Sequence, residues 1–344
     1  MSPFIKNALK FLLFLGIGIG LVYLIVSKIT PADWKNIKTA AVNANYLWIV
    51  ISVVLGVFSH LVRAARWRML IEPIDKKPGM ANTFAAVMIG YLANYAVPRL
   101  GEVSRCGVLA RYEKISFAGL VGTVVVERII DLLFMLLFFL LMLLLSFSKV
   151  YGIVKTKATT ILESKWDSLK HVNLFILIAI VVVVIGGIWF LYKKRDSLFG
   201  FAKKFIANFS GGIKSVGNLK KPILFWSYSL AIWILYLFSM YVCFFSFSET
   251  AHLSLSDTLV VFVFATFGVI APVPGGIGAY QWLVISVLTH IYFISQTTAF
   301  TLAWIMWGSQ LILILTVGLI SLVVLPLINK DDNKTGSNTI EGTN

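Results

Sequence analysis

The stretch NYAVPRLGEVSRCGVLARYEKISFAGLVGTVVVERIID, residues 94–131, decides how the rest of the chain is interpreted. Pro98 and Gly101 interrupt an apolar run, because proline lacks the backbone donor that a helix needs and glycine disfavours helix. Charged side chains follow at short intervals, and burying them within an apolar chain is unfavourable. We therefore expect this stretch to form half of a polar pathway through a membrane. The charged residues that we expect at membrane depth or just below it are Arg99, Glu102, Arg105, Glu127, Arg128 and Asp131.

The composition predicts an all-α polytopic membrane protein. Of the 344 residues, 59% are hydrophobic and 13% are charged, and the mean hydropathy is +0.89. An average soluble domain has roughly 25% charged residues. Several apolar runs reach the length of about 20 residues that crosses the hydrocarbon core of a bilayer. We expect about six full spans, at residues 9–26, 46–62, 117–147, 173–192, 222–245 and 301–327.

The net charge of +15 does not indicate a nucleic-acid partner. Lys and Arg cluster in the loops between apolar runs, as the positive-inside rule and anionic headgroups predict, and no nucleic-acid-binding motif is present. Cys106 and Cys243 lack zinc or redox spacing, and the four histidines form no metal-ligand pair. Hydrolase and nucleotide-binding motifs are missing as well. We expect no metal, no cofactor and no catalytic residue.

The orientation follows from the flanking charges. Lys6 and Lys10 precede the first apolar run, and no small-x-small cleavage site follows it, so we expect an uncleaved span with a cytoplasmic N-terminus in the cell membrane. Loops at residues 27–45 and 148–172 are then expected on the outside. The second loop departs from the positive-inside rule, because it carries five lysines and two acidic residues.

Two arginines at the cytoplasmic end of the second span allow two interpretations. Arg63 and Arg66 are three residues apart and share a helix face, with Trp67 expected at the interface. They either anchor the span to lipid phosphates or capture a headgroup at the mouth of a cavity.

A second interruption, PVPGGIGAYQ at residues 272–281, resembles the first. Its prolines and glycines cannot continue a helix, and each break follows a short apolar segment and leads into another helix. Because three expected spans lie between the breaks, the two hairpins should enter from opposite sides. We therefore expect two re-entrant broken-helix hairpins in an inverted repeat, with halves at residues 46–147 and 222–327 and a site near the midplane.

The charged group on the long apolar run is again open to two interpretations. Glu127 and Asp131 are four residues apart and share a helix face, while Arg128 lies about 100° round the helix. Pairing with Arg99 or Arg105 would offset part of the unfavourable burial. The group is either a structural ion-pair network between hairpin and helix, or a set of arginines that meet a phosphate while the carboxylates position them.

The second break contains no charged side chain, but it offers backbone N–H groups that could bind an anion. Gly275, Gly276 and Gly278 would let main-chain N–H groups approach an anion, with support from the following helix N-terminus. The alternative is a plain helix breaker that fills space between spans. Gln281 is the strong polar side chain that comes directly after it.

Four motifs in this order make the chain similar to the membrane domain of the lysylphosphatidylglycerol synthase family, a group of flippase-like integral membrane proteins. The resemblance covers residues 10–327. It departs at Gln281, where the family usually has Glu, which counts against proton coupling there but not against a hydrogen-bonding role. The motifs are R-x-x-R-W (Arg63, Arg66, Trp67), N-x-x-x-P-x-x-G-E-x-x-R (Asn94, Pro98, Gly101, Glu102, Arg105), E-R-x-x-D (Glu127, Arg128, Asp131) and P-x-P-G-G-x-G (Pro272, Pro274, Gly275, Gly276, Gly278).

The resemblance implies translocation of an anionic, aminoacylated or polyprenyl-linked lipid across the cytoplasmic membrane. Residues 1–328 would form the flippase-like domain and residues 329–344 a disordered polar tail, in the place where synthases have a soluble domain, so we do not expect aminoacyl transfer. A lipid-modifying transferase is the main alternative and a non-transporting membrane partner the third, while homo-oligomer formation is left open. The residues expected to bind lipid or line its path are Arg63, Arg66, Asn94, Pro98, Arg99, Glu102, Arg105, Glu127, Arg128, Asp131, Pro274, Gly275, Gly276, Gly278 and Gln281.

Overall fold

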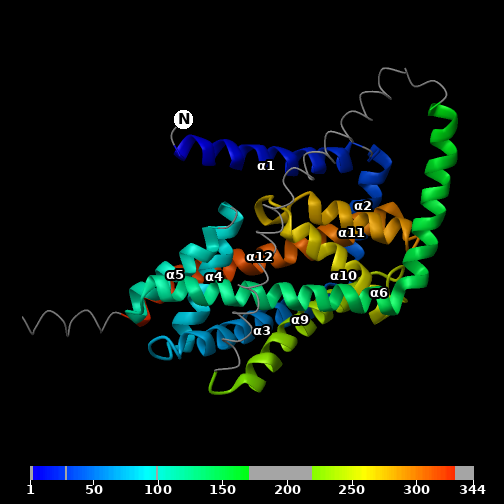
Figure 1. Cartoon of the computed structure of the whole chain (residues 1–344). Coiled ribbons are helices and arrows are strands. Elements are labelled where there is room, and N and C mark those ends of the chain that lie inside the picture. The colour runs from blue at the N-terminus through cyan, green and yellow to red at the C-terminus, as the bar shows by residue number, and fades with distance from the viewer. Residues whose placement is uncertain (1–2, 28, 98–99, 170–218, 330–344) are drawn as a thin grey trace, which may run out of the picture.

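The computed structural model describes residues 3–27, 29–97, 100–169 and 219–329, with only the backbone given for residues 3–11, 13, 14 and 147–169. All regular structure in these ranges is helical, which confirms the predicted all-α class (Figure 1). The elements are α1 (Pro3–Val26), α2 (Pro31–Asn43), α3 (Tyr46–Ile71), α4 (Met80–Ala96), α5 (Leu100–Glu113), α6 (Phe117–Leu169), α9 (Pro222–Cys243), η1 (Phe244–Ser246), α10 (Leu255–Ile270), η2 (Pro274–Gly276), α11 (Ala279–His290) and α12 (Gln296–Ile328).

Four helices in the described ranges are long and apolar enough to cross a membrane: Tyr46–Ile71, Phe117–Ser146, Pro222–Ser246 and Gln296–Ile328. They correspond to four of the six expected spans. The first expected span qualifies only as part of a pair, Leu15–Val26 with Pro31–Asn43, which is bent by 100°. The expected span at residues 173–192 lies outside the described residues, so the count of six stays a prediction.

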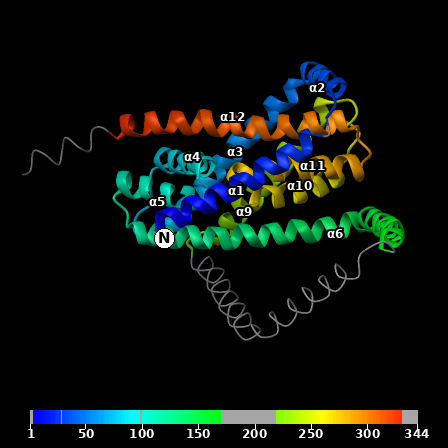
Figure 2. The same ribbon diagram turned by 90° about the horizontal axis from the view of Figure 1, so that it is seen from above.

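Helices α3 and α9 lie side by side and antiparallel in the bundle, and α6 and α12 flank it on opposite sides (Figure 2). Two contacts fix the direction of the central pair. The hydroxyl oxygens of Ser52 and Ser239 are 2.8 Å apart, and Arg66 donates to Ser229 at 3.3 Å. Residue numbers therefore rise along α3 as they fall along α9.

Aromatic rings fill the space between α6, α9 and α10. Trp233 lies 5.4 Å from Phe138 and 5.9 Å from Phe262 between ring centroids. In lipid, helix association depends on van der Waals fit more than on exclusion of water. Interlocking rings of this kind therefore hold the three helices in a fixed relation.

The first predicted break separates α4 from α5, which pack against each other as a hairpin. The side-chain oxygen of Asn94 accepts a hydrogen bond from the backbone N–H of Gly101 at 2.7 Å. It thus satisfies one of the free donors at the start of α5. The two backbones approach most closely at Gly90 and Gly101, where a Cβ on Gly101 would collide with the Gly90 carbonyl. Pro98 and Arg99 lie outside the described residues.

The second predicted break lies between α10 and α11, and it touches the first. Gly275 has a φ of 57°, and a Cβ there would run into the ring of Tyr95 at the end of α4. Trp307 of α12 donates its indole N–H to the Gly275 carbonyl at 2.8 Å. The two interruptions, far apart in sequence, therefore meet inside the bundle.

Two stretches predicted as loops are helical in the structure. Residues 31–43 form α2, because Thr30 and Asp33 make a capping box at its start. Most of residues 148–172 continue α6 as far as Leu169, and this end of the helix turns away from the bundle (green in Figure 1). Both errors have the same cause, since Lys, Glu and Ala favour helix as strongly as many apolar residues do.

The close approach of α4 and α5 predicts the effect of adding one methyl group. Gly101→Ala should lower the free energy of unfolding by about 1–3 kcal/mol, because the fixed Gly90 carbonyl cannot move aside cheaply. Gly107→Ala, on the same helix, meets no atom within 4 Å and should be neutral or stabilising by up to about 1 kcal/mol. Unfolding in mixed detergent micelles measures both, and equal effects of the two changes would contradict the tight contact.

Candidate functional site

A buried ion-pair network joins α3, α5 and α6. Arg63 contacts Glu127 at 2.7 Å and Asp131 at 2.8 Å, and Arg66 contacts the same carboxylates at 3.3 Å and 2.8 Å. Arg105 reaches Glu127 from α5 at 3.2 Å. The Arg66 and Glu127 side chains have no exposed surface. Among the described side chains, Glu127 therefore neutralises charge from three arginines.

Helix periodicity explains the geometry of this network. Arg63 and Arg66 are one turn apart on α3, and Glu127 and Asp131 are one turn apart on α6. Two guanidinium groups can therefore face two carboxylates across the helix pair. Charge-assisted hydrogen bonds of this kind are among the strongest in proteins, and the planar guanidinium suits two acceptors at once.

The structure corrects the interfacial placement of the arginine-rich end of α3. Arg63 is 5% exposed and Arg66 is fully buried, so neither anchors the span at a membrane surface. Trp67 is also fully buried, donates to the Thr123 hydroxyl at 2.9 Å and lies under the Arg105 guanidinium. A basic run after an apolar run normally marks a cytoplasmic flank. Here the carboxylates on α6 draw the arginines inward.

A second ion pair, between Arg128 and Glu102, lies beside the buried network. Its atoms are 2.5 Å apart, and the two side chains are 46% and 28% exposed. Arg128 follows Glu127 directly, so it points about 100° away from the buried network. Adjacent residues of α6 thus face two different surroundings. The pairing of Glu127 with Arg105 is as predicted, whereas Asp131 pairs with Arg63 and Arg66 instead. Arg99 lies outside the described residues.

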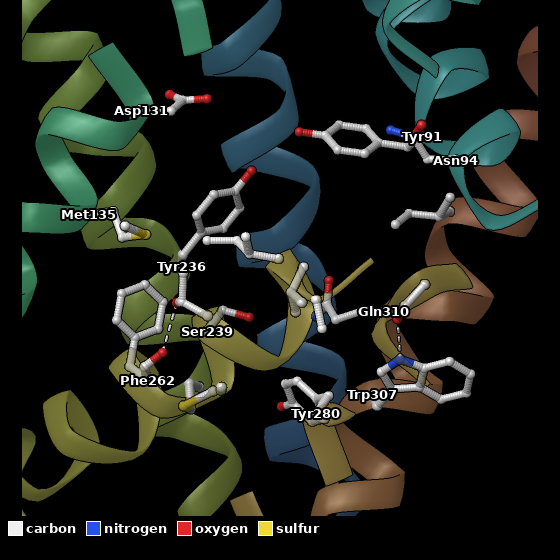
Figure 3. Close-up of a pocket in the computed structure, with 18 of the residues that line it drawn as sticks. Tyr91, Asn94, Asp131, Met135, Tyr236, Ser239, Phe262, Tyr280, Trp307 and Gln310 are labelled. Carbon is white, nitrogen blue, oxygen red and sulfur yellow. Dashed lines mark hydrogen bonds between the residues drawn. The ribbon is translucent and has the colours of Figure 1, made fainter. Parts of the chain in front are cut away.

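A cavity of about 720 Å³ lies between the two helix breaks. One end is polar, with the Arg63 guanidinium, the Asp131 carboxylate and the Tyr91 and Tyr236 hydroxyls; Figure 3 shows Asp131 and both tyrosines on this side. His60 contributes its ring, whose centroid lies 4.7 Å from that of Tyr91 at an interplanar angle of 46°. The polar end therefore offers cationic, anionic and hydroxyl groups within one space.

The opposite end of the cavity is mostly aromatic. Phe262, Tyr280 and Trp307 line it in Figure 3, with the polar side chains of Ser239 and Gln310 beside them. Trp233 and Met306 also line the cavity. Tyr95 and Gly275 bring both helix breaks to the wall. A ligand that fills the whole cavity must therefore be amphipathic, with a charged part and an apolar part.

The predicted site residues divide by their position relative to this cavity. Arg63, Asn94, Glu102, Arg128, Asp131 and Gly275 line it, whereas Arg66, Arg105 and Glu127 lie behind its wall. Glu127 and Arg66 contact the lining residues Arg63 and Asp131, and Arg105 contacts Glu127. Pro98 and Arg99 are not described. The remaining predicted residues, at the second break, do not line the cavity: Pro274, Gly276, Gly278 and Gln281.

Two of the three glycines of the second break already use their backbone N–H groups. The N–H of Gly276 donates to the Val273 carbonyl at 3.0 Å, and that of Gly278 donates to the Gln281 side-chain oxygen at 2.7 Å. Gln281 is fully buried, and its side-chain oxygen serves to cap the start of α11. These two glycines therefore do not offer their N–H groups to an anion in this state.

Sequence reasoning missed His60, Tyr91 and Tyr236. His60 lies three residues before Arg63 on α3, and Tyr91 three residues before Asn94 on α4, so helical spacing from the motif residues could have found both. Tyr236 carries no such signal, because it belongs to a helix rich in aromatic residues. Within the described ranges, no group of three or more His, Cys, Asp or Glu residues could hold a metal ion.

The charge balance of the polar end favours an anion. Four arginines and three carboxylates make up the two ion-pair groups, which leaves one positive charge in excess. A phosphate or carboxylate group in the cavity could supply the missing negative charge.

Glu127→Gln tests how far the fold depends on the buried network. We expect the free energy of unfolding to fall by about 3–5 kcal/mol, because the change leaves buried guanidinium groups without their shared carboxylate. The matched control is Glu72→Gln. Glu72 pairs with Lys220 at 2.9 Å on the surface, where ion pairs contribute about 0–1 kcal/mol. Similar losses in the two variants, measured by unfolding in mixed micelles, would contradict a structural role of the network.

Comparison of the sequence with known proteins identifies its family. Residues 11–318 match the family described as "Lysylphosphatidylglycerol synthase TM region". The UPF0104 membrane protein MJ1595 of Methanocaldococcus jannaschii is 24% identical over 167 residues, which are 48% of this chain and 47% of that protein. The aligned part thus spans about half the length of this relative, and no solved structure matches the chain. Because the family match covers most of the sequence, the chain belongs to the lysylphosphatidylglycerol synthase transmembrane-region family.

Proposed function

We propose that this multi-pass membrane protein moves a lipid with an anionic headgroup between the leaflets of the cell membrane. The observation that carries the proposal is the amphipathic cavity between two broken helices. Paired broken helices are a frequent device for substrate sites near the middle of a membrane. A lipid in transit needs both a polar space for its head and an apolar surface beside it, and this cavity has the two side by side.

Arg63 and Arg128 are the groups we assign to the phosphate. Both line the cavity, and each is already held by a carboxylate that fixes its position. Structural and ligand-binding roles are therefore compatible in one network. The buried pairs of Glu127 with Arg63, Arg66 and Arg105 would keep the wall in place while Arg128 changes partners.

An inverted repeat is part of the proposal. In each half a long helix is followed by a broken pair and a second long helix, first α3 to α6 and then α9 to α12. The antiparallel contact of α3 with α9 supports opposite orientations of the halves. Two opposed halves give a transporter two similar states, one open to each side. We place the N-terminus in the cytoplasm on the basis of its flanking lysines.

Arg128→Gln tests the translocation directly. In vesicles that contain the purified protein and a phosphatidylglycerol with a fluorescent headgroup, we expect the wild type to expose inner-leaflet lipid to a membrane-impermeant quencher. The variant should lower that rate about tenfold or more, because a hydrogen bond to a charged group contributes about 1.5–3 kcal/mol.

The matched control for this assay is Arg111→Gln. Arg111 is exposed on α5 and lies outside the cavity, so its loss should leave the rate unchanged. A wild-type rate no higher than that of protein-free vesicles would contradict translocation. Mass spectrometry of the recovered lipids covers the transferase alternative, because a covalently altered lipid would indicate a lipid-modifying enzyme instead.

The orientation can be tested by cysteine labelling in intact cells. The native Cys106 and Cys243 are buried and should give little background. We expect Thr159→Cys to react with an impermeant maleimide from the outside, and Lys76→Cys to react only after the membrane is opened. Labelling of the first variant solely in opened cells would contradict the opposed arrangement of the halves.

A further inference from the structure

A second, smaller pocket of about 380 Å³ lies between α5 and α6. Val103 and Cys106 of α5 form one wall, and Val121, Val125 and Ile129 of α6 form the other. Apart from one ion pair, every residue that lines it is apolar. We call it the α5–α6 groove.

The groove adjoins the central cavity. Glu102, Arg128 and Leu132 line both spaces, so the Arg128–Glu102 ion pair stands at the boundary between them. One side of this pair therefore faces the polar and aromatic cavity, and the other side faces a purely apolar groove.

The walls of the groove are open to the outside of the protein. Val103 is 53% exposed and Val125 is 54% exposed. Gly107 and Gly122, which share helix faces with these two valines, have open space where a side chain would be. In a membrane protein this outward surface meets lipid, so an acyl chain can enter the groove from the side without crossing water.

We propose that the α5–α6 groove binds one acyl chain of a phospholipid whose phosphate contacts Arg128 at the boundary. The lipid's headgroup then reaches into the central cavity. The two side chains of this pair are 46% and 28% exposed, so a phosphate can approach Arg128 and take the place of Glu102. The buried pairs of Glu127 are shielded from such exchange. This inference rests on the proposed function only in taking a lipid as ligand.

A photoreactive phosphatidylglycerol with a diazirine in its acyl chain tests the groove. The full-length protein is reconstituted in phosphatidylcholine vesicles that contain this probe, illuminated and mapped by peptide mass spectrometry. We expect labelling of the peptides around Val103 and Val125 to exceed that around Leu140 at least fivefold. Val125→Trp should fill the groove and reduce groove labelling by a similar factor.

Leu140→Trp is the matched control, because Leu140 lies on the same helix with 55% exposure but outside the groove. It should leave groove labelling unchanged. Val103→Trp blocks the groove from the opposite wall and gives an independent reading if Val125→Trp misfolds. Equal labelling of the Val125 and Leu140 regions, or labelling that neither groove variant reduces, would overturn the acyl-chain site.

A second probe tests the phosphate contact. A diacylglycerol with the same diazirine chain lacks the phosphate, so it should label the groove several-fold less than the phospholipid does. Arg128→Gln should bring phospholipid labelling down to the diacylglycerol level. Equal labelling by both probes in the wild type would overturn the placement of the phosphate at Arg128.

These experiments test the acyl-chain site and the proposed translocation independently of each other. Groove labelling without translocation would reject the proposed function and keep the acyl-chain site. Translocation without groove labelling would reject the acyl-chain site and keep the proposed function, since the lipid would then enter the cavity by another route.

Discussion

Glu127 is the residue on which the arrangement of the first half depends. Its carboxylate has no exposed surface and meets guanidinium groups from α3 and α5, within the part of the chain that the structure describes. Charges buried this deeply must stay paired, because an isolated one is strongly destabilising. Helices α3, α5 and α6 therefore cannot separate without exposing several charges to an apolar medium. This constraint fixes the wall of the cavity, and it fixes where in space α5 lies after the first helix break.

Neighbouring charged residues of α6 have two different roles. Glu127 faces the buried network, whereas Arg128, one residue later, faces the cavity and the α5–α6 groove. A rigid network behind the wall can hold a few exposed groups in place while these exchange partners. In this arrangement the buried ion pairs supply position, and the partly exposed Arg128–Glu102 pair is the one that a ligand can reach.

Local signals made both helix breaks predictable, because proline and glycine act on the backbone at the position where they occur. Pairing of Glu127 with Arg105 also followed from the need to neutralise a buried charge. The partners of Arg63 and Arg66 could not be predicted in this way, because Glu127 and Asp131 are more than 60 residues away in sequence. A basic run after a span also normally indicates the membrane surface. The predicted loops failed for another reason, since polar composition does not exclude helix and the capping box at Thr30 was overlooked.

The glycines of the second break gain a different meaning from the contact between the two breaks. Gly275 leaves room for the Tyr95 ring, and its carbonyl accepts the Trp307 indole N–H. Any side chain at this position would push α4 away from η2 and open the cavity wall. Gly276 and Gly278 already use their N–H groups within the protein. The charged residues of the site thus come from α3, α5 and α6. The second break contributes glycine backbone, which lets the Tyr95 ring of α4 pack directly against it.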